Sequence, residues 1–236
     1  MQAKKDLIPR LKGEAAKLEG ELISISNSSD PYPNLEVKID LMRKCLEILS
    51  RRDCRIQVVT KSNIMVRDRD LLKEIPSMVT LTITTDNDNI SKIIEPNAPP
   101  SSKRLKTVET LIRKGIPTSV RIDPIIPFVN DNPENLVETL ASIRVKHITS
   151  STYKVKPDNW KRFSMALPKT AEKLKPFYFE KGEKIGRYTY LPKESRLKLM
   201  KNMGVLAKNY GIQFGTCREG LSYLNTATCD GSWLIQ

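Results

Sequence analysis

The sequence predicts an α/β fold whose strands form a parallel sheet or barrel. Short β-branched, apolar runs begin near positions 22, 56, 79, 118 and 145, and a helical pattern follows each of them. Several of these runs end abruptly in polar residues. Strands that alternate with helices in this way lie parallel and are joined by right-handed crossovers.

The clearest strand–helix–strand unit runs from Arg55 to Asp86. Residues 56–60 and 79–84 have the β-branched composition of buried strands, and between them Asp68 is expected to cap a short helix that ends before Pro76. The two strands end in the polar runs TKS and TTD. Ligands bind at the carboxyl edge of parallel sheets, so these polar tips predict part of a small-molecule site.

The other elements follow in chain order. The remaining predicted strands cover residues 22–26, 118–123 and 145–149. The remaining predicted helices cover residues 4–19, 37–49, 103–114, 133–143, 158–167 and 193–209. Cys45 lies close to the apolar side of its helix and is expected in the core. Residues 87–102 are expected to form a long polar loop that folds over the site.

The composition is strongly basic. The 236 residues include 40 Lys and Arg against 27 Asp and Glu, a formal net charge of +13. Such an excess favours a polyanionic partner, nucleic acid first and an anionic membrane second. A generally basic proteome, or the Lys and Glu enrichment of thermophiles, explains the same charge.

Several classes of protein are disfavoured. No apolar run approaches the roughly 20 residues of a membrane span, and the amino-terminal residues lack the apolar centre of a signal peptide. We therefore expect a cytoplasmic protein with reduced thiols and no membrane partner. The single histidine, His147, excludes multi-histidine metal sites, and neither GxGxxG nor GxxxxGK[ST] occurs.

Several motifs occur in a specific order: SSDPYP after the first strand, then VTKS, RDxDLL, TITT, EPxAP, GIPxSVRIDPIIPFVND and CREG. Together they resemble the radical SAM proteins of the spore photoproduct lyase (DNA repair photolyase-like) group, from about Lys5 to the carboxyl end. The resemblance implies an incomplete parallel (β/α) barrel of radical SAM (partial TIM) type with its first β/α unit missing. The barrel core is expected over residues 1–152, and a carboxyl-terminal helical and loop extension over 153–236 is expected to pack on the barrel or close it.

The sequence departs from this family at the iron–sulfur cluster. The family holds a [4Fe–4S] cluster with a CxxxCxxC loop, which does not occur here. Three closely spaced thiolates are needed to ligate such a cluster, and Cys45 and Cys54, nine residues apart, do not replace them. We assign no metal ligands, and we expect the amino-terminal segment to have been lost by truncation. A relic without cluster chemistry is the alternative.

The resemblance also implies a binding site for S-adenosylmethionine. Lys61 is expected to contact the methionine carboxylate, and Thr82 and Thr84, which share one face of their strand, to donate hydrogen bonds. The full expected cofactor-binding set is Ser28, Ser29, Asp30, Lys61, Thr82, Thr84 and Arg104. Each also has a structural explanation: a solvated lysine at the rim, ordinary strand threonines, and an Asx turn before Pro31.

Other candidates lie further along the chain. Cys217 is the candidate catalytic residue, as a hydrogen-atom donor, with inert thiols or ligands to a second cluster as alternative roles for Cys217 and Cys229. Arg121 and Asp123 are expected to form a structural ion pair, with each other or with Arg104 or Glu95, inside the barrel. His147 is placed near the amino end of its strand, away from the predicted site.

Three functions are compatible with these features. The first is a radical SAM enzyme core that, with the cluster loop present, would generate a 5′-deoxyadenosyl radical. The second is a catalytically inactive nucleic-acid-binding module that uses the basic, aromatic stretch 153–190, whose rings pack the open side of the barrel in the alternative interpretation. The third is a phosphate-handling barrel enzyme that uses Lys61, although glycine-rich loops are lacking.

Overall fold

The computed structural model describes residues 6–25 and 29–235, and its centre is a six-stranded parallel sheet with strand order β1-β2-β3-β4-β5-β8. The strands are β1 (Leu22–Ile25), β2 (Arg55–Thr60), β3 (Ser77–Thr82), β4 (Thr118–Ile125), β5 (His147–Thr152) and β8 (Gln213–Thr216). The five predicted strands are therefore confirmed as parallel neighbours. The sixth, β8, was not predicted and comes from the segment beyond residue 152.

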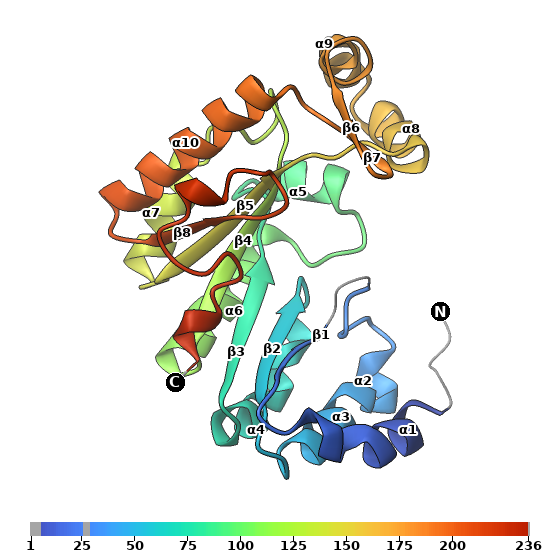
Figure 1. Cartoon of the computed structure of the whole chain (residues 1–236), viewed down its shortest axis with the longest axis vertical. Coiled ribbons are helices and arrows are strands. Elements are labelled where there is room, and N and C mark those ends of the chain that lie inside the picture. Colours follow the sequence, from blue (N-terminus) through green and yellow to red (C-terminus); the bar gives the residue numbers. More distant parts are fainter. Residues whose placement is uncertain (1–5, 26–28, 236) are drawn as a thin grey trace.

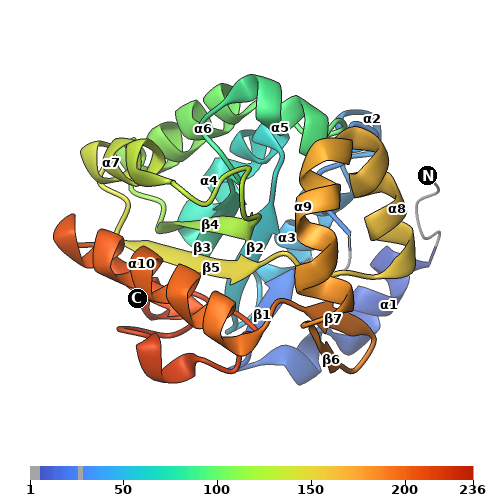
Figure 2. The same cartoon turned by 90° about the horizontal axis from the view of Figure 1, so that it is seen from above.

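Helices cover the outer face of the curved sheet (Figures 1 and 2). They are α1 (Leu7–Glu14), η1 (Ala15–Leu18), α2 (Glu36–Ile39), α3 (Leu41–Leu49), η2 (Asn63–Asp68), α4 (Arg69–Glu74), α5 (Asp88–Ile94), α6 (Ser101–Arg113), α7 (Glu134–Ser142) and α10 (Lys193–Asn209). The predicted helix over 193–209 is reproduced to the residue, and those over 103–114 and 133–143 to within two residues.

The two faces of the sheet differ in chemistry because side chains alternate along each strand. Val58, Leu81, Val120 and Ile148 belong to the main apolar core. The neighbouring positions on the inner face are polar and form hydrogen bonds with one another: the Gln57 amide donates to Thr80 Oγ1 at 3.1 Å, and Thr80 and Ser119 hydroxyls lie 2.8 Å apart. The sheet thus encloses a polar hollow, as a ligand-binding barrel requires.

Two predicted segments are corrected. The single helix expected over 37–49 is two helices, α2 and α3, separated at Asp40, which adopts a left-handed conformation with φ 50°. The loop expected over 87–102 contains helix α5, whose amino terminus is capped by the Asn87 side chain accepting from the N–H groups of Asn89 and Ile90. Helix α5 ends at Ile94, directly before Glu95.

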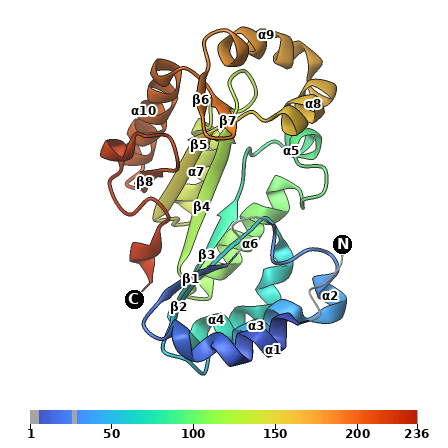
Figure 3. The same ribbon diagram turned by 45° about the vertical axis from the view of Figure 1, so that its right-hand side comes forward.

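An insertion between β5 and α10 stands at the carboxyl edge of the sheet (Figures 1 and 3). It comprises α8 (Pro157–Ala166), α9 (Pro168–Phe179) and the antiparallel hairpin β6 (Glu183–Ile185) and β7 (Tyr188–Tyr190), of which only α8 was predicted. Trp160 and Phe163 pack with Tyr153 and Tyr178 in a second apolar cluster, at ring separations of 5.1–5.9 Å. These rings therefore serve packing, as the alternative interpretation of stretch 153–190 proposed.

The carboxyl-terminal segment crosses the inner face of the sheet. Gln57 donates to the carbonyl of Asp230 at 2.8 Å, and Thr149 Oγ1 donates to the carbonyl of Cys229 at 2.8 Å. A Cβ on Gly215 would lie 2.8 Å from Cys229 Cα, so this close approach requires glycine. The segment closes the hollow on the side away from the strand tips.

Candidate functional site

The loop that follows β1 forms the first part of the candidate site. Asp30 accepts hydrogen bonds from Thr60 Oγ1 at 2.6 Å, from Lys61 N at 2.7 Å and from Tyr32 N at 2.9 Å. The last contact is the predicted Asx turn, and the first two join this loop to the tip of β2. Ser29 is exposed beside it, whereas Ser28 lies outside the described residues.

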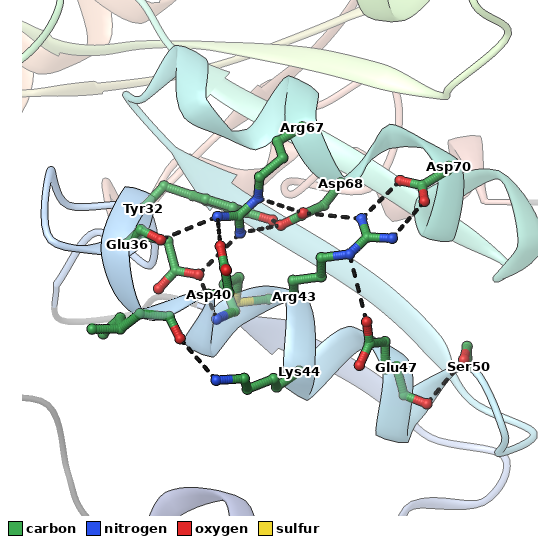
Figure 4. Close-up of polar contacts among 12 residues, drawn as sticks. Tyr32, Glu36, Asp40, Arg43, Lys44, Glu47, Ser50, Arg67, Asp68 and Asp70 are labelled. Carbon is green, nitrogen blue, oxygen red and sulfur yellow. Dashed lines mark hydrogen bonds and ion pairs between the residues drawn. The ribbon is translucent and has the colours of Figure 1, made fainter.

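A buried polar network supports this loop from the outside (Figure 4). Tyr32 donates its hydroxyl to Asp68 Oδ2 at 3.0 Å, and Arg67 joins Asp68 to Glu36 and Asp40 at 2.5–3.0 Å. Asp68 was predicted to cap a helix, but its side chain makes no cap hydrogen bond and serves this network instead. Burial and the neighbouring Asp68 carboxylate raise the pKa of Tyr32 well above its ordinary value.

The tips of β2 and β3 meet at Glu95. The Lys61 ammonium lies 2.7 Å from Glu95 Oε1, Thr84 donates its hydroxyl to the same oxygen at 2.9 Å, and Arg104 Nη2 lies 2.7 Å from Oε2. Burial alone would raise the pKa of the Glu95 carboxyl, but the charges of Lys61 and Arg104 hold this pKa below its ordinary value. The structure therefore brings Lys61 and Thr84 together, as predicted, through Glu95, which the sequence had suggested only as a partner of Arg121 or Asp123.

Arg104 and Thr82 lie deeper than the ligand-contacting positions expected for them. Arg104 is fully buried and its guanidinium also donates to the carbonyls of Pro99 and Thr82 and to Ser91 Oγ. Thr82 is buried and paired in register with Arg121 of β4. A direct contact of either side chain with a cofactor stays a prediction.

Two neighbouring cavities open at this edge. One, of about 720 Å³, is lined by Lys61, Thr84, Glu95 and residues of α8. The other, of about 620 Å³, reaches into the polar hollow between Arg121 and Cys217. Both volumes are in the range of small-molecule sites, and the cavities share Pro124, Tyr153 and Asn159 on their walls. Residues 93–97 line the larger cavity, so the segment expected to cover the site does border it.

The inner cavity contains the expected Arg121–Asp123 pair. Arg121 Nη2 lies 2.6 Å from Asp123 Oδ2, and Ser151 donates to Asp123 Oδ1 at 2.6 Å. Burial alone would lower the pKa of the Arg121 guanidinium. The nearby Asp123 and Cys217 have the larger combined effect and raise this pKa above its ordinary value. Cys217 is half-buried at this wall and Cys229 is exposed, and the catalytic role of Cys217 stays a prediction.

The remaining cysteines belong to the core, as expected for Cys45. Cys45 and Cys54 are buried, and burial raises the pKa of both thiols, that of Cys45 to about 11. Within residues 6–25 and 29–235 no three His, Cys, Asp or Glu side chains are grouped to hold a metal ion. The described residues therefore do not fit a [4Fe–4S] cluster.

His147 is the first residue of β5 and lies away from the strand tips, as predicted, and of the two open alternatives, core and surface, the structure shows a buried position. It is fully buried and accepts a hydrogen bond at Nδ1 from the indole N–H of Trp233 at 3.1 Å. Burial lowers its pKa to about 4, which keeps the ring neutral near pH 7.

No helix in the described part of the chain is long and apolar enough to cross a membrane.

Comparison with known proteins identifies relatives over part of the chain. No protein-family model matches it. The uncharacterized protein MJ0683 of Methanocaldococcus jannaschii is 37% identical over 110 residues, which cover 46% of this chain and 42% of the relative. The uncharacterized protein ORF301 of Acidianus two-tailed virus is 30% identical over 138 residues, 55% of this chain and 45% of the relative. The chain spans less than half the length of these curated relatives.

Solved structures share its fold. Spore photoproduct lyase complexed with dinucleoside spore photoproduct superposes with a TM-score of 0.69 at 15% identity, over 90% of this chain and 66% of the lyase. A domain of pyruvate-formate lyase-activating enzyme from Bacteroides vulgatus gives a TM-score of 0.54 at 14% identity, over 84% and 99%. The chain therefore has the parallel partial (β/α)-barrel fold of the radical SAM enzymes.

Proposed function

We propose that this chain is the S-adenosylmethionine-binding core of a radical SAM enzyme resembling the spore photoproduct lyase group. The observation that carries the proposal is the junction of Lys61 and Thr84 on neighbouring strand tips, beside the 720 Å³ cavity at the carboxyl edge of the sheet. A spore photoproduct lyase variant with bound AdoMet shares the fold, with a TM-score of 0.64 at 15% identity over 89% of this chain and 65% of the lyase.

The donor set at this edge fits that cofactor. Lys61, whose side chain is 40% exposed, would bind the carboxylate, and the loop at Ser29 and Asp30 would face the methionine amino group. Thr84 would fix the cavity wall through Glu95. Radical SAM enzymes use bound S-adenosylmethionine as the source of a 5′-deoxyadenosyl radical at a reduced [4Fe–4S] cluster. The described residues do not hold such a cluster, so we expect cofactor binding, and no cleavage, from this chain alone.

Calorimetric titration with S-adenosylmethionine tests the proposal. Lys61→Met removes the cation and keeps the length of the side chain, and a charged hydrogen bond of this kind changes affinity by about tenfold to a hundredfold. Lys106→Met, at an exposed position on α6, is the matched control and should leave the affinity unchanged. Absence of binding to the unmodified chain, or equal affinities for the Lys61 and Lys106 variants, would contradict the proposal.

A second test addresses the cluster. After anaerobic incubation with iron and sulfide, followed by desalting, the chain should retain no stoichiometric iron and show no cluster absorbance. A stable cluster together with cleavage of S-adenosylmethionine would overturn our conclusion that the described residues do not hold a [4Fe–4S] cluster.

A nucleic-acid interface is the second candidate, because the positive charge is concentrated. Residues 153–210 contain 15 Lys and Arg against five Asp and Glu, so they carry +10 of the net +13. Binding through this segment would fall steeply with salt. Replacing the exposed Lys169, Lys173 and Lys175 by Ala should weaken binding to a duplex probe.

The control for this experiment removes the same charge elsewhere. Lys12, Lys17 and Lys38 are exposed on the amino-terminal part of the chain, and their triple Ala variant should bind as the unmodified protein does. Equal loss in both triple variants would indicate a response to net charge alone, and no binding at low salt would remove this candidate.

A further inference from the structure

Glu95 holds a buried position between two cations at the mouth of the larger cavity. Its side chain is 8% exposed, with one oxygen 2.7 Å from Lys61 Nζ and the other 2.7 Å from Arg104 Nη2. Thr84 adds a hydrogen bond of 2.9 Å to the oxygen that faces Lys61. Oε1 thus has two close partners, and Oε2 is buried beside the Arg104 guanidinium at ion-pair distance without a hydrogen bond of its own.

Arg104 anchors this carboxylate because its own position is fixed. Besides its ion pair with Glu95, its nitrogens donate hydrogen bonds to the carbonyl of Pro99 at 2.9 Å, the carbonyl of Thr82 at 2.9 Å and Ser91 Oγ at 2.7 Å. Withdrawal of Glu95 would leave a fully buried guanidinium without its counter-charge, which is strongly unfavourable. Glu95 therefore stays in place when Lys61 meets a ligand.

The charges leave Lys61 available to an anion. Lys61 and Arg104 contribute two positive charges and Glu95 one negative charge, so the three side chains together carry +1. An ammonium has three donors, and Glu95 takes one of them. The exposed part of Lys61 borders the cavity, where the residual charge matches one carboxylate.

We propose that Glu95 is a positioning residue that aims Lys61 at the carboxylate of S-adenosylmethionine, with Arg104 and Thr84 as its anchors. The inference rests on the proposed function and assigns Arg104 a supporting role in place of a ligand contact. In the alternative role, Glu95 would occupy Lys61 in the empty site and compete with the ligand carboxylate for it. A competitor would have to leave when the ligand binds, and the anchors prevent this.

The test compares two ligands that differ only in the carboxylate, S-adenosylmethionine and decarboxylated S-adenosylmethionine. The unmodified chain should prefer the carboxylate-bearing ligand by about tenfold or more, the value of a charged hydrogen bond. Glu95→Asp keeps the charge beside Arg104 but withdraws it from Lys61 by one methylene, so the preference should fall several-fold. Lys61→Met should abolish it. A purely structural defect would lower the affinity for both ligands by the same factor and leave the preference unchanged.

Matched controls separate the possible outcomes. Glu138→Asp, at an exposed position of α7, should keep the full preference. Thr84→Val removes one anchor and should lower the preference, which gives a second variant if Glu95→Asp folds poorly. An unchanged preference in both Glu95→Asp and Thr84→Val would overturn the proposal, and so would tighter binding of S-adenosylmethionine by Glu95→Asp.

Failure of the proposed function would be distinguishable from failure of this inference. If the unmodified chain binds neither ligand, the cofactor assignment is wrong, and the position of Lys61 is then tested alone. In reductively ¹³C-methylated protein, the Lys61 resonance is assigned with Lys61→Arg and should move in Glu95→Asp but not in Glu138→Asp. A resonance that does not move would overturn the positioning role.

Discussion

Neutralising Glu95 should destabilise the fold as a whole. Glu95→Gln preserves the shape of the side chain but removes the counter-charge of Arg104, which is 0% exposed. Removing one partner of a buried ion pair costs about 3–5 kcal/mol. We expect the low end, about 3 kcal/mol, because the amide oxygen can still accept one hydrogen bond. For a chain of this length that corresponds to a fall in Tm of about 6–12 °C.

Urea denaturation followed by circular dichroism measures this loss, and a double-mutant cycle identifies its cause. Arg104→Met replaces the guanidinium by an apolar side chain, so the Glu95→Gln/Arg104→Met variant should lose less than the sum of the single losses, by about 1–3 kcal/mol. A loss below about 1 kcal/mol for Glu95→Gln, the value of an ordinary hydrogen bond, would refute the reasoning.

The pH dependence of the same variant gives an independent check. The pKa of Glu95 lies below its ordinary value of 4.5 in the folded state. A lowered carboxyl pKa stabilises the fold above pH 4.5, and this contribution is lost as the pH falls through the folded-state pKa. The stability difference between the unmodified chain and Glu95→Gln should therefore be constant near pH 7 and shrink in acid. A difference that grows in acid would contradict the sign.

Three further predictions concern other parts of the structure. His147, whose pKa is lowered from 6.5 to about 4, should cost the unmodified chain up to about 3 kcal/mol as the pH falls from 6.5 to 4, and His147→Gln should lack this loss. Gly215→Ala should lower stability by about 1–3 kcal/mol, because its Cβ would lie 2.8 Å from Cys229 Cα. Tyr32→Phe should cost about 1–3 kcal/mol by removing a buried hydrogen bond to the Asp68 carboxylate, whose Oδ2 then keeps only Arg67 Nη2 as a donor.

Controls for these substitutions use open or exposed positions. Gly13→Ala adds a Cβ that has no neighbour within 4 Å, and Tyr223→Phe removes a hydroxyl from a side chain that is 67% exposed. Gly13→Ala should if anything raise the midpoint of urea denaturation, because Ala favours helix α1, and Tyr223→Phe should change it little. If the stability of Gly215→Ala or Tyr32→Phe is no lower than that of these controls, the corresponding contact is wrong. If His147→Gln still loses stability in acid, the loss does not come from His147.

The strands could be predicted because each carries a local β-branched signal, and their order along the chain implied parallel neighbours. Strand β8 could not, because Gln213–Thr216 is short and contains Gly215, and its place beside β5 depends on residues 66 positions earlier, as in the pair His147 and Gln213. The break at Asp40 was missed for a similar reason. Neither glycine nor proline marks it, and the left-handed residue is stabilised by Arg67 from elsewhere in the chain.

The candidate site was predicted in part. Strand ends revealed Lys61 and Thr84, since polar residues after apolar runs are visible in the sequence. Glu95 was expected only within EPxAP and as a possible partner of Arg121 or Asp123, because its actual partners, just after β2, just after β3 and on α6, are not adjacent to it in sequence. The available signal was Asn87, a good amino-terminal cap, which indicated helix α5 and therefore a defined position for the residue after it.

The crossing of the inner face by the carboxyl-terminal segment has a consequence for biosynthesis. The contact between Gln57 and Asp230 joins residues 173 positions apart, and Trp233 reaches His147 over 86 positions. Strands β2 to β5 can pair while the ribosome is still translating the rest of the chain. The inner face of the sheet is covered only after residues near 230 have been synthesised. We expect nascent chains halted before that point to remain sensitive to protease at the inner strand positions.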